Sequence, residues 1–383
     1  MAQRNLVICL DGTSNEPEHG LTNVARIYDI AVKDSAQLVY YDPGVGTMGA
    51  RAAMTQFGAA LTRVSGLIAG YGIRDNIEQA YTWLSQNYQH DDQIYVFGFS
   101  RGAYTARALT GMLATVGLLR PGSENLVPYA LKLYAQSGFS QRATCDPDCE
   151  PDASVPEQQH QFWYVRREFR RLFGNPDFPN PFDTSRSQVR FLGVWDTVKS
   201  VGWLNMRGRW EVARWPFTAR IVNVAVARHA LAIDEKRHFY QPYRFSRDLV
   251  DAEPERFQEV WFTGAHSDVG GQFPDDHRLS DLALAWMADE AARNELRVQP
   301  NRIRRLTGAP VGSPLPAGDA VGRIHAASWP WWLLGGWSPR QVLPDDLVAP
   351  SVLERVAATA ATPAPYRPEL ADRRMALAIE RGE

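Results

Sequence analysis

Residues 93–104 constrain the fold of this chain more than any other stretch. An apolar run of β-branched and aromatic residues leads into Gly-Phe-Ser-Arg-Gly at 98–102, and a helix-favouring, alanine-rich segment follows directly. The pattern predicts a strand, a sharp turn and a helix, with Ser100 at the tip of the turn. A Cβ atom at Gly98 or Gly102 would clash where strand and helix approach each other. The stretch therefore indicates a nucleophile elbow.

Two backbone segments are candidates to stabilise negative charge beside Ser100. The amide of Arg101 lies at the positive end of the predicted helix and can donate to a developing oxyanion. A second donor is expected from the loop after a neighbouring strand. The apolar run at 5–10 ends in Asp11-Gly12-Thr13, and glycine permits close backbone approach. We therefore expect the amide of Gly12 or Thr13 to complete an oxyanion hole.

A serine needs a base to take its proton and an acid to orient that base. In α/β-hydrolases the order is serine, acid, histidine, each after its own strand. Asp196 follows an apolar run at 189–195, 96 residues after Ser100 (196 − 100), and His266 follows the run at 259–262 after a further 70 (266 − 196). The sequence predicts Ser100, Asp196 and His266 as the catalytic residues.

The acid has two rivals. Asp268 lies two residues from His266, where we expect it to cap a glycine-rich loop, and Asp11 also ends a strand. Rivals for the base do not follow a good strand; they are His19, His90, His160, His229, His238, His277 and His325.

Apolar runs alternate with segments of helical periodicity, which predicts a mostly parallel sheet with helices on both faces. The expected fold is α/β, α/β-hydrolase-like, with inserted cap segments. We expect residues 1–300 to form the catalytic domain and 301–383 to form an irregular extension packed on the same domain. The expected strands are 5–10, 37–41, 93–99, 189–195 and 259–262, and the expected helices are 73–88, 103–116, 220–233 and 279–293.

Two segments are candidates to cover an acyl pocket because their apolar and aromatic residues lie between strands that end at the active edge. One is the insertion at about 121–188, with helical periodicity at 125–136 and 161–173. The other is the tryptophan-rich connection at 203–215. A third aromatic cluster, at 329–334, either packs on the body or forms a surface that touches lipid.

Composition excludes several classes of function. The net charge is −2 and there is no basic block, so we expect no nucleic-acid partner. Of three cysteines, Cys145 and Cys149 could form half a metal site, but no second pair stands at ligand spacing. We expect no metal and no organic cofactor. No signal-peptide core and no run of about 18 apolar residues is present, so we expect a chain made in the cytoplasm.

Several motifs recur together in a known group. They are Leu10-Asp11-Gly12-Thr13, Thr22-Asn23-Val24, Gly98-Phe99-Ser100-Arg101-Gly102-Ala103, Val194-Trp195-Asp196-Thr197-Val198 and Gly264-Ala265-His266-Ser267-Asp268-Val269-Gly270-Gly271. With these, the chain resembles an α/β-hydrolase family that includes catalytic domains of bacterial type VI secretion phospholipase effectors. The match runs from about residue 5 to 290.

The resemblance implies a serine esterase, with the nucleophile at Ser100, the acid at Asp196 and the base at His266. It implies a lipid or other ester substrate, cleaved at an acyl ester, and contact with a membrane surface. It also implies delivery by a type VI system, with a secretion-apparatus or immunity protein as partner. Two alternatives stay open: a non-catalytic interaction protein on the same fold, and a hydrolase of soluble esters or amides. A phosphatase of the haloacid-dehalogenase kind is disfavoured because Cys9 stands where its nucleophilic aspartate belongs.

Overall fold

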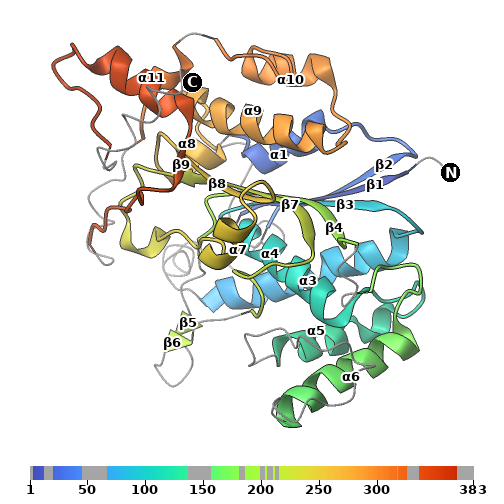
Figure 1. Ribbon diagram of the computed structural model, residues 1–383. Coiled ribbons are helices and arrows are strands. Elements are labelled where there is room, and N and C mark those ends of the chain that lie inside the picture. Colours follow the sequence, from blue (N-terminus) through green and yellow to red (C-terminus); the bar gives the residue numbers. More distant parts are fainter. Residues whose placement is uncertain are drawn as a thin grey trace, which may run out of the picture.

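A seven-stranded sheet with helices on both faces forms the centre of the molecule (Figure 1). The computed structural model describes residues 3–12, 20–44, 67–136, 157–180, 186–198, 203–204, 210–211, 215–316, 318–325 and 336–368. The strands are β1 (Asn5–Leu10), β2 (Gln37–Asp42), β3 (Gln93–Phe99), β4 (Val189–Trp195), β7 (Val224–Ala232), β8 (Phe257–Phe262) and β9 (Leu347–Val348). A separate two-stranded sheet pairs β5 (Trp203–Leu204) with β6 (Trp210–Glu211).

The main sheet is parallel throughout, in the order β2-β1-β3-β4-β7-β8-β9. Every residue of β1 is buried, as expected for a strand covered on both faces. The chain moves from β1 outward to β2 and then returns to β3 on the other side of β1. Ligands bind at such a switch point in open parallel sheets, outside the carboxyl ends of the strands. Here that edge carries Gly12 after β1 and Ser100 after β3.

Two helical layers cover the sheet. One contains α3 (Leu67–Asn87) and α4 (Arg101–Val116), and the other contains α1 (Asn23–Ile30) and α9 (Arg278–Arg293), with α10 (Pro300–Thr307) outside them (Figure 1). Thr22 caps α1 by accepting a hydrogen bond from the Ala25 amide at 3.1 Å. Gly117 ends α4 with a φ of 73°, which glycine adopts without steric cost.

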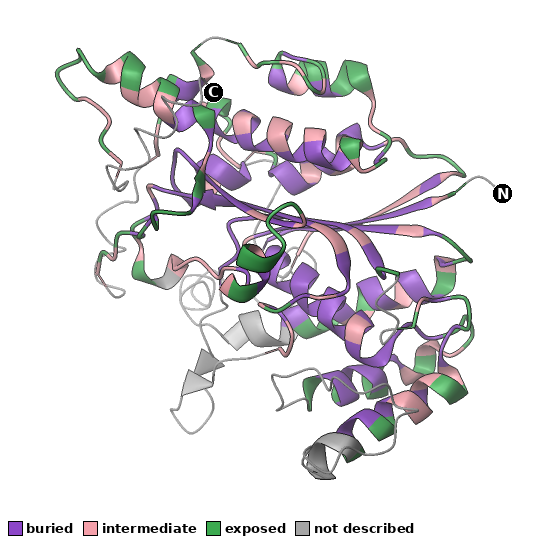
Figure 2. Cartoon of the chain, viewed as in Figure 1, coloured by how far each residue is buried: buried purple, intermediate pink, exposed green. Residues whose placement is uncertain are grey.

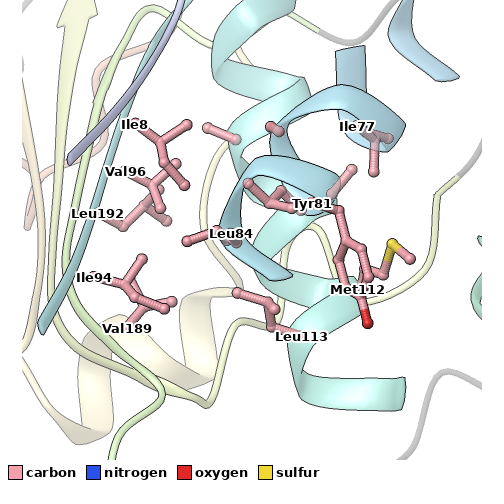
Figure 3. Close-up of a cluster of buried hydrophobic side chains, with 14 of the residues drawn as sticks. Ile8, Ile77, Tyr81, Leu84, Ile94, Val96, Met112, Leu113, Val189 and Leu192 are labelled. Atoms are coloured by element: carbon pink, nitrogen blue, oxygen red, sulfur yellow. The ribbon is translucent and has the colours of Figure 1, made fainter. Parts of the chain in front are cut away.

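Figure 2 shows that the buried residues gather in the sheet and on the helices that cover it, and their side chains form two clusters, one on each face of the sheet. On the α3 and α4 side, Ile8, Val96 and Leu192 of three neighbouring strands face Leu84 and Leu113 of the helices (Figure 3). Full burial of each such side chain contributes about 1.5–3 kcal/mol. This core fixes α4 against β3 and so holds the turn between them.

One expected helix is a strand. We predicted a helix over 220–233, but β7 occupies Val224–Ala232 in the middle of the sheet, between β4 and β8. A strand buried on both faces shows a nearly continuous apolar run, which periodicity does not separate from a buried helix. Val224 and Val226 are β-branched and favour the strand, and the pairing on both edges decides it.

The described helices of the 121–188 insertion pack on α3 and α4. They are α5 (Val127–Ala135), after the short 3-10 helix η3 (Glu124–Leu126), and α6 (Glu157–Phe173). Both lie outside α3 and α4 as a further layer (Figure 1). Phe178 contacts Tyr88, just before β3 begins, with ring centroids 5.2 Å apart. This part of the insertion therefore reaches the edge of the sheet opposite the elbow.

The C-terminal part holds more regular structure than its proline content suggested. It contains α10, the 3-10 helix η5 (Asp319–Val321), β9 and α11 (Pro350–Thr359), and β9 extends the sheet beside β8. The aromatic cluster at 329–334 lies outside the described residues. Within the part of the chain that the structure describes, no helix is long and apolar enough to cross a membrane.

Candidate active site

Ser100 occupies a strained turn between β3 and α4. Its φ of 57° and ψ of −119° lie outside the regions that L-residues prefer, as the predicted elbow requires. The Ser100 amide donates to the carbonyl of Trp195 at the end of β4, at 3.1 Å. This bond ties the elbow to the strand that carries Asp196.

The two glycines of the motif have the predicted role. A Cβ atom on Gly98 would lie 2.5 Å from the carbonyl oxygen of Gly102. A Cβ atom on Gly102 would lie 2.1 Å from the carbonyl oxygen of Leu10 in β1. Real Cβ atoms do not approach backbone oxygens so closely, so β3, α4 and β1 meet at this distance only because both residues are glycine.

Asp196 follows β4 and is fully buried, with a φ of 36°. Its Oδ1 accepts hydrogen bonds from the amide of Ala232, at 3.1 Å, and from Nη1 of Arg340, at 2.5 Å. Its Oδ2 accepts from Nη2 of Arg340 at 3.0 Å and faces Nδ1 of His266 at 2.5 Å. Both carboxylate oxygens are thus held in place.

His266 begins the short helix α8 (His266–Gly270), directly beyond β8, and its Nε2 lies 2.8 Å from Oγ of Ser100. An ionised carboxylate only accepts hydrogen bonds, so Nδ1 carries the proton toward Asp196 and Nε2 presents its lone pair to Ser100. The structure therefore brings Ser100, His266 and Asp196 into one hydrogen-bonded series.

Burial sets the protonation states of this series. Burial lowers the pKa of His266 below its ordinary value, and the hydrogen bond that its Nδ1 donates to Asp196 only partly opposes that effect. Burial by itself would raise the pKa of Asp196, but Arg340 and His266 more than offset it, so that pKa lies below the ordinary value. The imidazole is therefore neutral and the carboxylate ionised at neutral pH.

Residues of two further sequence motifs support the position of His266 from either side. Phe99 packs on the imidazole in a tilted arrangement at 4.7 Å between ring centroids, and a Cβ on Gly270 would meet that phenyl ring at 2.0 Å. Asn23 donates to the carbonyls of Val269 in α8, at 2.9 Å, and of Ser280 in α9, at 3.0 Å. Gly270 and Asn23 thus fix the helix that carries the imidazole.

The rival acids have other partners. Asp268 accepts from the amide of Ala265 at 2.9 Å, which matches its expected capping role, and pairs with His325 at 2.5 Å. The carboxylate of Asp11 accepts from Thr22 at 2.5 Å, from Tyr41 at 2.9 Å and from the Gly12 amide at 2.7 Å.

The hydrogen bond between the Gly12 amide and Asp11 affects the expected oxyanion hole. The Arg101 amide stands at the first turn of α4, where the helix itself supplies no acceptor. The Gly12 amide, in contrast, is engaged with the side chain of Asp11. Thr13 lies outside the described residues. The strand adjacency that motivated this expectation is present, because β1 pairs with β3 and Leu10 lies opposite Gly98.

Sequence reasoning missed Arg340 and misplaced His229. Arg340 is separated from Asp196 by 144 residues, and no spacing or motif in the sequence pairs them. His229, expected in a helix, lies in β7, where its Nε2 accepts from the amide of Thr197 at 3.1 Å. Its Nδ1 then donates to Glu259 at 2.8 Å, and burial lowers its pKa to about 4. A neutral histidine on the neighbouring strand therefore holds the backbone of Thr197, the residue after Asp196.

Aromatic residues border the site. The ring of Tyr240 meets His266 edge-on at 4.8 Å between centroids. Tyr104, in the first turn of α4, accepts from the amide of Trp215 at 3.0 Å and contacts Tyr243 at 5.6 Å. Trp215 ends the tryptophan-rich connection, so this expected cover segment does reach the helix that starts at the elbow. No group of three or more potential metal ligands occurs among the described residues.

Fold and elbow together define an α/β protein of hydrolase-like architecture, with its site at the carboxyl edge of a parallel sheet. The profile of one family, the type VI secretion system (T6SS) phospholipase effector Tle1-like catalytic domain, matches residues 4–290. The chain belongs to this family.

Individual relatives are more distant. An uncharacterized protein of Saccharomyces cerevisiae, YEL023C, is 29% identical over 250 residues, which cover 63% of this chain and 33% of that protein. A crystal structure of an uncharacterized protein from Pseudomonas aeruginosa has a TM-score of 0.40 and 17% identity. The match covers 79% of this chain and 47% of the chain in that structure. The structure of the Tle1 effector bound to the VgrG spike has a TM-score of 0.38 and 18% identity. The match covers 71% of this chain and 51% of the chain in that structure. The chain thus spans about a third to a half of these relatives.

Proposed function

We propose that this chain is a serine hydrolase that cleaves carboxylic esters of lipids through an acyl-enzyme. The observation that carries the proposal is the series from Ser100 Oγ to His266 Nε2, at 2.8 Å, and from His266 Nδ1 to Asp196 Oδ2, at 2.5 Å. Membership in a family of phospholipase effector catalytic domains supports a lipid ester as the substrate class.

In the proposed reaction, Ser100 Oγ attacks the ester carbonyl while His266 Nε2 takes its proton. Asp196 stabilises the imidazolium that forms. The Arg101 amide donates to the oxyanion, and the Gly12 amide joins it when its bond to Asp11 opens; otherwise the Thr13 amide takes this place. His266 then protonates the leaving alcohol, and a water activated by the same imidazole hydrolyses the acyl-enzyme.

The acyl chain has an apolar border available. Tyr104 contacts both Trp215 and Tyr243 beside the first turn of α4, and the ring of Tyr240 meets His266 edge-on. We propose that the connection ending at Trp215 forms part of the cover over the acyl pocket. Helix α5 of the 121–188 insertion backs this segment, because the ring of Tyr134 stacks on Trp215 at 5.6 Å between centroids and its hydroxyl donates to the carbonyl of Pro216 at 2.7 Å.

Delivery and partner are proposed on family grounds alone. Because the matched family is that of type VI secretion phospholipase effector Tle1-like catalytic domains, we propose delivery by such a system and a secretion-apparatus protein as partner of this chain. Co-purification with a spike protein of such a system tests this separately from hydrolysis.

A fluorophosphonate probe and lipid vesicles test the enzymatic proposal. The wild-type protein should label at Ser100 and release fatty acid from phosphatidylethanolamine–phosphatidylglycerol vesicles. Ser100→Ala should lose labelling and at least about four decades of turnover. Ser85→Ala, which alters a buried serine of α3 bonded to the Tyr81 carbonyl, is the matched control and should keep both.

The outcomes separate the alternatives. Labelling at Ser100 with turnover of p-nitrophenyl butyrate but none of vesicles would favour a hydrolase of soluble esters. Absence of labelling and of turnover in folded wild-type protein would favour a non-catalytic interaction protein and refute the proposal.

A further inference from the structure

Arg340 is a buried cation beside Asp196, and it comes from outside the part of the chain that matches the family. The family profile ends at residue 290, 50 residues earlier (340 − 290). The Arg340 side chain is completely buried, like that of Asp196. A buried arginine needs a partner for its charge, and this partner is the proposed triad acid.

The guanidinium grips the carboxylate as a fork. Nη1 donates to Oδ1 of Asp196 at 2.5 Å and Nη2 donates to Oδ2 at 3.0 Å. Nη1 also donates to the carbonyl of Ala232, at 2.8 Å, and Nη2 to that of Tyr240. Because the fork is planar and rigid, two parallel bonds fix the plane of the carboxylate as well as its place.

The plane of the carboxylate matters because Oδ2 must face Nδ1 of His266. A buried aspartate can rotate about its last bond, and only specific partners select one orientation. Ala232 supplies one bond to Oδ1. Arg340 contacts both oxygens, and so it fixes the plane in which one of them faces the imidazole.

The segment around Arg340 is itself anchored near the site. The Ser338 amide donates to the carbonyl of Lys236 at 2.7 Å, and Gln241 donates to the carbonyl of Ser338 at 3.0 Å. Further along, Asp346 accepts from Arg244 at 2.6 Å and from the indole of Trp261 at 3.0 Å. Residues 336–346 are thus held at the carboxyl edge of the sheet by the body of the protein.

We propose that Arg340 is a positioning residue for ester hydrolysis: it orients Asp196 toward His266 and makes residues 336–346 part of the active site. This inference rests on the proposed function. It also means that the region matched by the family profile lacks one group that the proposed triad uses.

A purely structural ion pair and a positioning residue differ in their effect on protonation. Asp196 and His266 share a short hydrogen bond and take up their first proton as a pair. A neighbouring cation disfavours that proton wherever it settles, so removing Arg340 raises the apparent pKa of the pair. The other titratable and charged groups around the pair are Glu235, Arg237 and Tyr240 in the segment after β7, and His229 in β7 itself.

The test compares Arg340→Met and Arg340→Lys with a matched control. Arg228→Met removes another buried arginine, which pairs with Glu290 at 2.6 Å on α9, away from the elbow. The readouts are the proton uptake of His266, followed by imidazole NMR and assigned with His266→Gln, and kcat and KM on p-nitrophenyl butyrate per folded molecule. The NMR readout requires no turnover, so it tests Arg340 even if wild-type protein hydrolyses nothing.

We expect Arg340→Met to raise the apparent pKa of the pair by about one unit or more and to lower kcat at least about a hundredfold, with KM within about twofold. Arg340→Lys keeps the charge without the fork, so it should restore the pKa more than kcat. Arg228→Met should lose stability but keep the wild-type apparent pKa and kcat. An Arg340→Met protein with wild-type pKa and kcat, or one whose changes equal those of Arg228→Met, would overturn the inference.

A double variant covers the case in which Arg340→Met does not fold. Asp196→Asn with Arg340→Met removes both buried charges, which restores a neutral pair. If Arg340 acts through Asp196, kcat of the double variant stays within about threefold of Asp196→Asn alone. A further tenfold loss would contradict that route of action.

Discussion

Gly102→Ala tests the elbow by adding a single methyl group. The residue lies in the first turn of α4, with ordinary helical torsions, so alanine is acceptable there to the backbone itself. Its Cβ, however, would meet the carbonyl oxygen of Leu10 at 2.1 Å and that of Asp11 at 2.6 Å. Both atoms are backbone, so no side-chain rotation can relieve the contact.

The size of the effect follows from these distances. A tolerable Cβ contact begins near 3.0 Å, so the end of β1 and the start of α4 must separate by about 0.9 Å (3.0 − 2.1). Overpacking of this kind costs about 1–3 kcal/mol in the free energy of unfolding. A shift of about 1 Å between reacting groups costs on the order of a hundredfold in rate. We therefore expect both losses together.

Denaturant unfolding and turnover of p-nitrophenyl butyrate measure the two losses. Gly122→Ala is the control, because that glycine has a φ of 87° and nothing within 4 Å of the added Cβ. It should cost roughly 1–2 kcal/mol through its torsions and leave kcat unchanged. Wild-type kcat in Gly102→Ala would show that β1 and α4 do not meet as described, and the account of the elbow would be wrong.

Two further predictions concern the acid and the base. Asp196→Asn should lower kcat by on the order of 10⁴, whereas Asp268→Asn should lower the free energy of unfolding by about 1–3 kcal/mol and kcat less than tenfold; the reverse ranking would assign the acid to Asp268. Because burial lowers the pKa of His266, the acid limb of kcat/KM should have its midpoint below pH 6.5. The imidazole of the unfolded chain binds its proton at a higher pH than that of the folded protein. The free energy of unfolding should therefore fall as the solution is acidified below about pH 6.5. A midpoint at or above pH 7 in a pH–rate profile would contradict the protonation states described.

The sequence was informative where local chemistry and position coincide. Gly98 and Gly102 bracket Ser100 between an apolar run and a helix-favouring segment, and this local pattern indicated the elbow. The positive φ of Ser100 and the close contacts of both glycines agree with it. Asp196 and His266 were predicted because each follows an apolar strand, and parallel strands bring such ends to one edge. The prediction failed at 220–233, because a strand buried on both faces has no alternation that reveals its period.

What the sequence by itself determined is the alternation of strands and helices, the elbow at Ser100, and the order in which serine, acid and histidine appear. These are properties of short segments, each with its own steric and hydrophobic signal. Only the tertiary structure decided that β7 lies between β4 and β8, that the Gly12 amide is turned to Asp11, and that Arg340 grips Asp196. Such contacts join residues far apart in the chain, and their free energy depends on burial and relative orientation that no local pattern encodes.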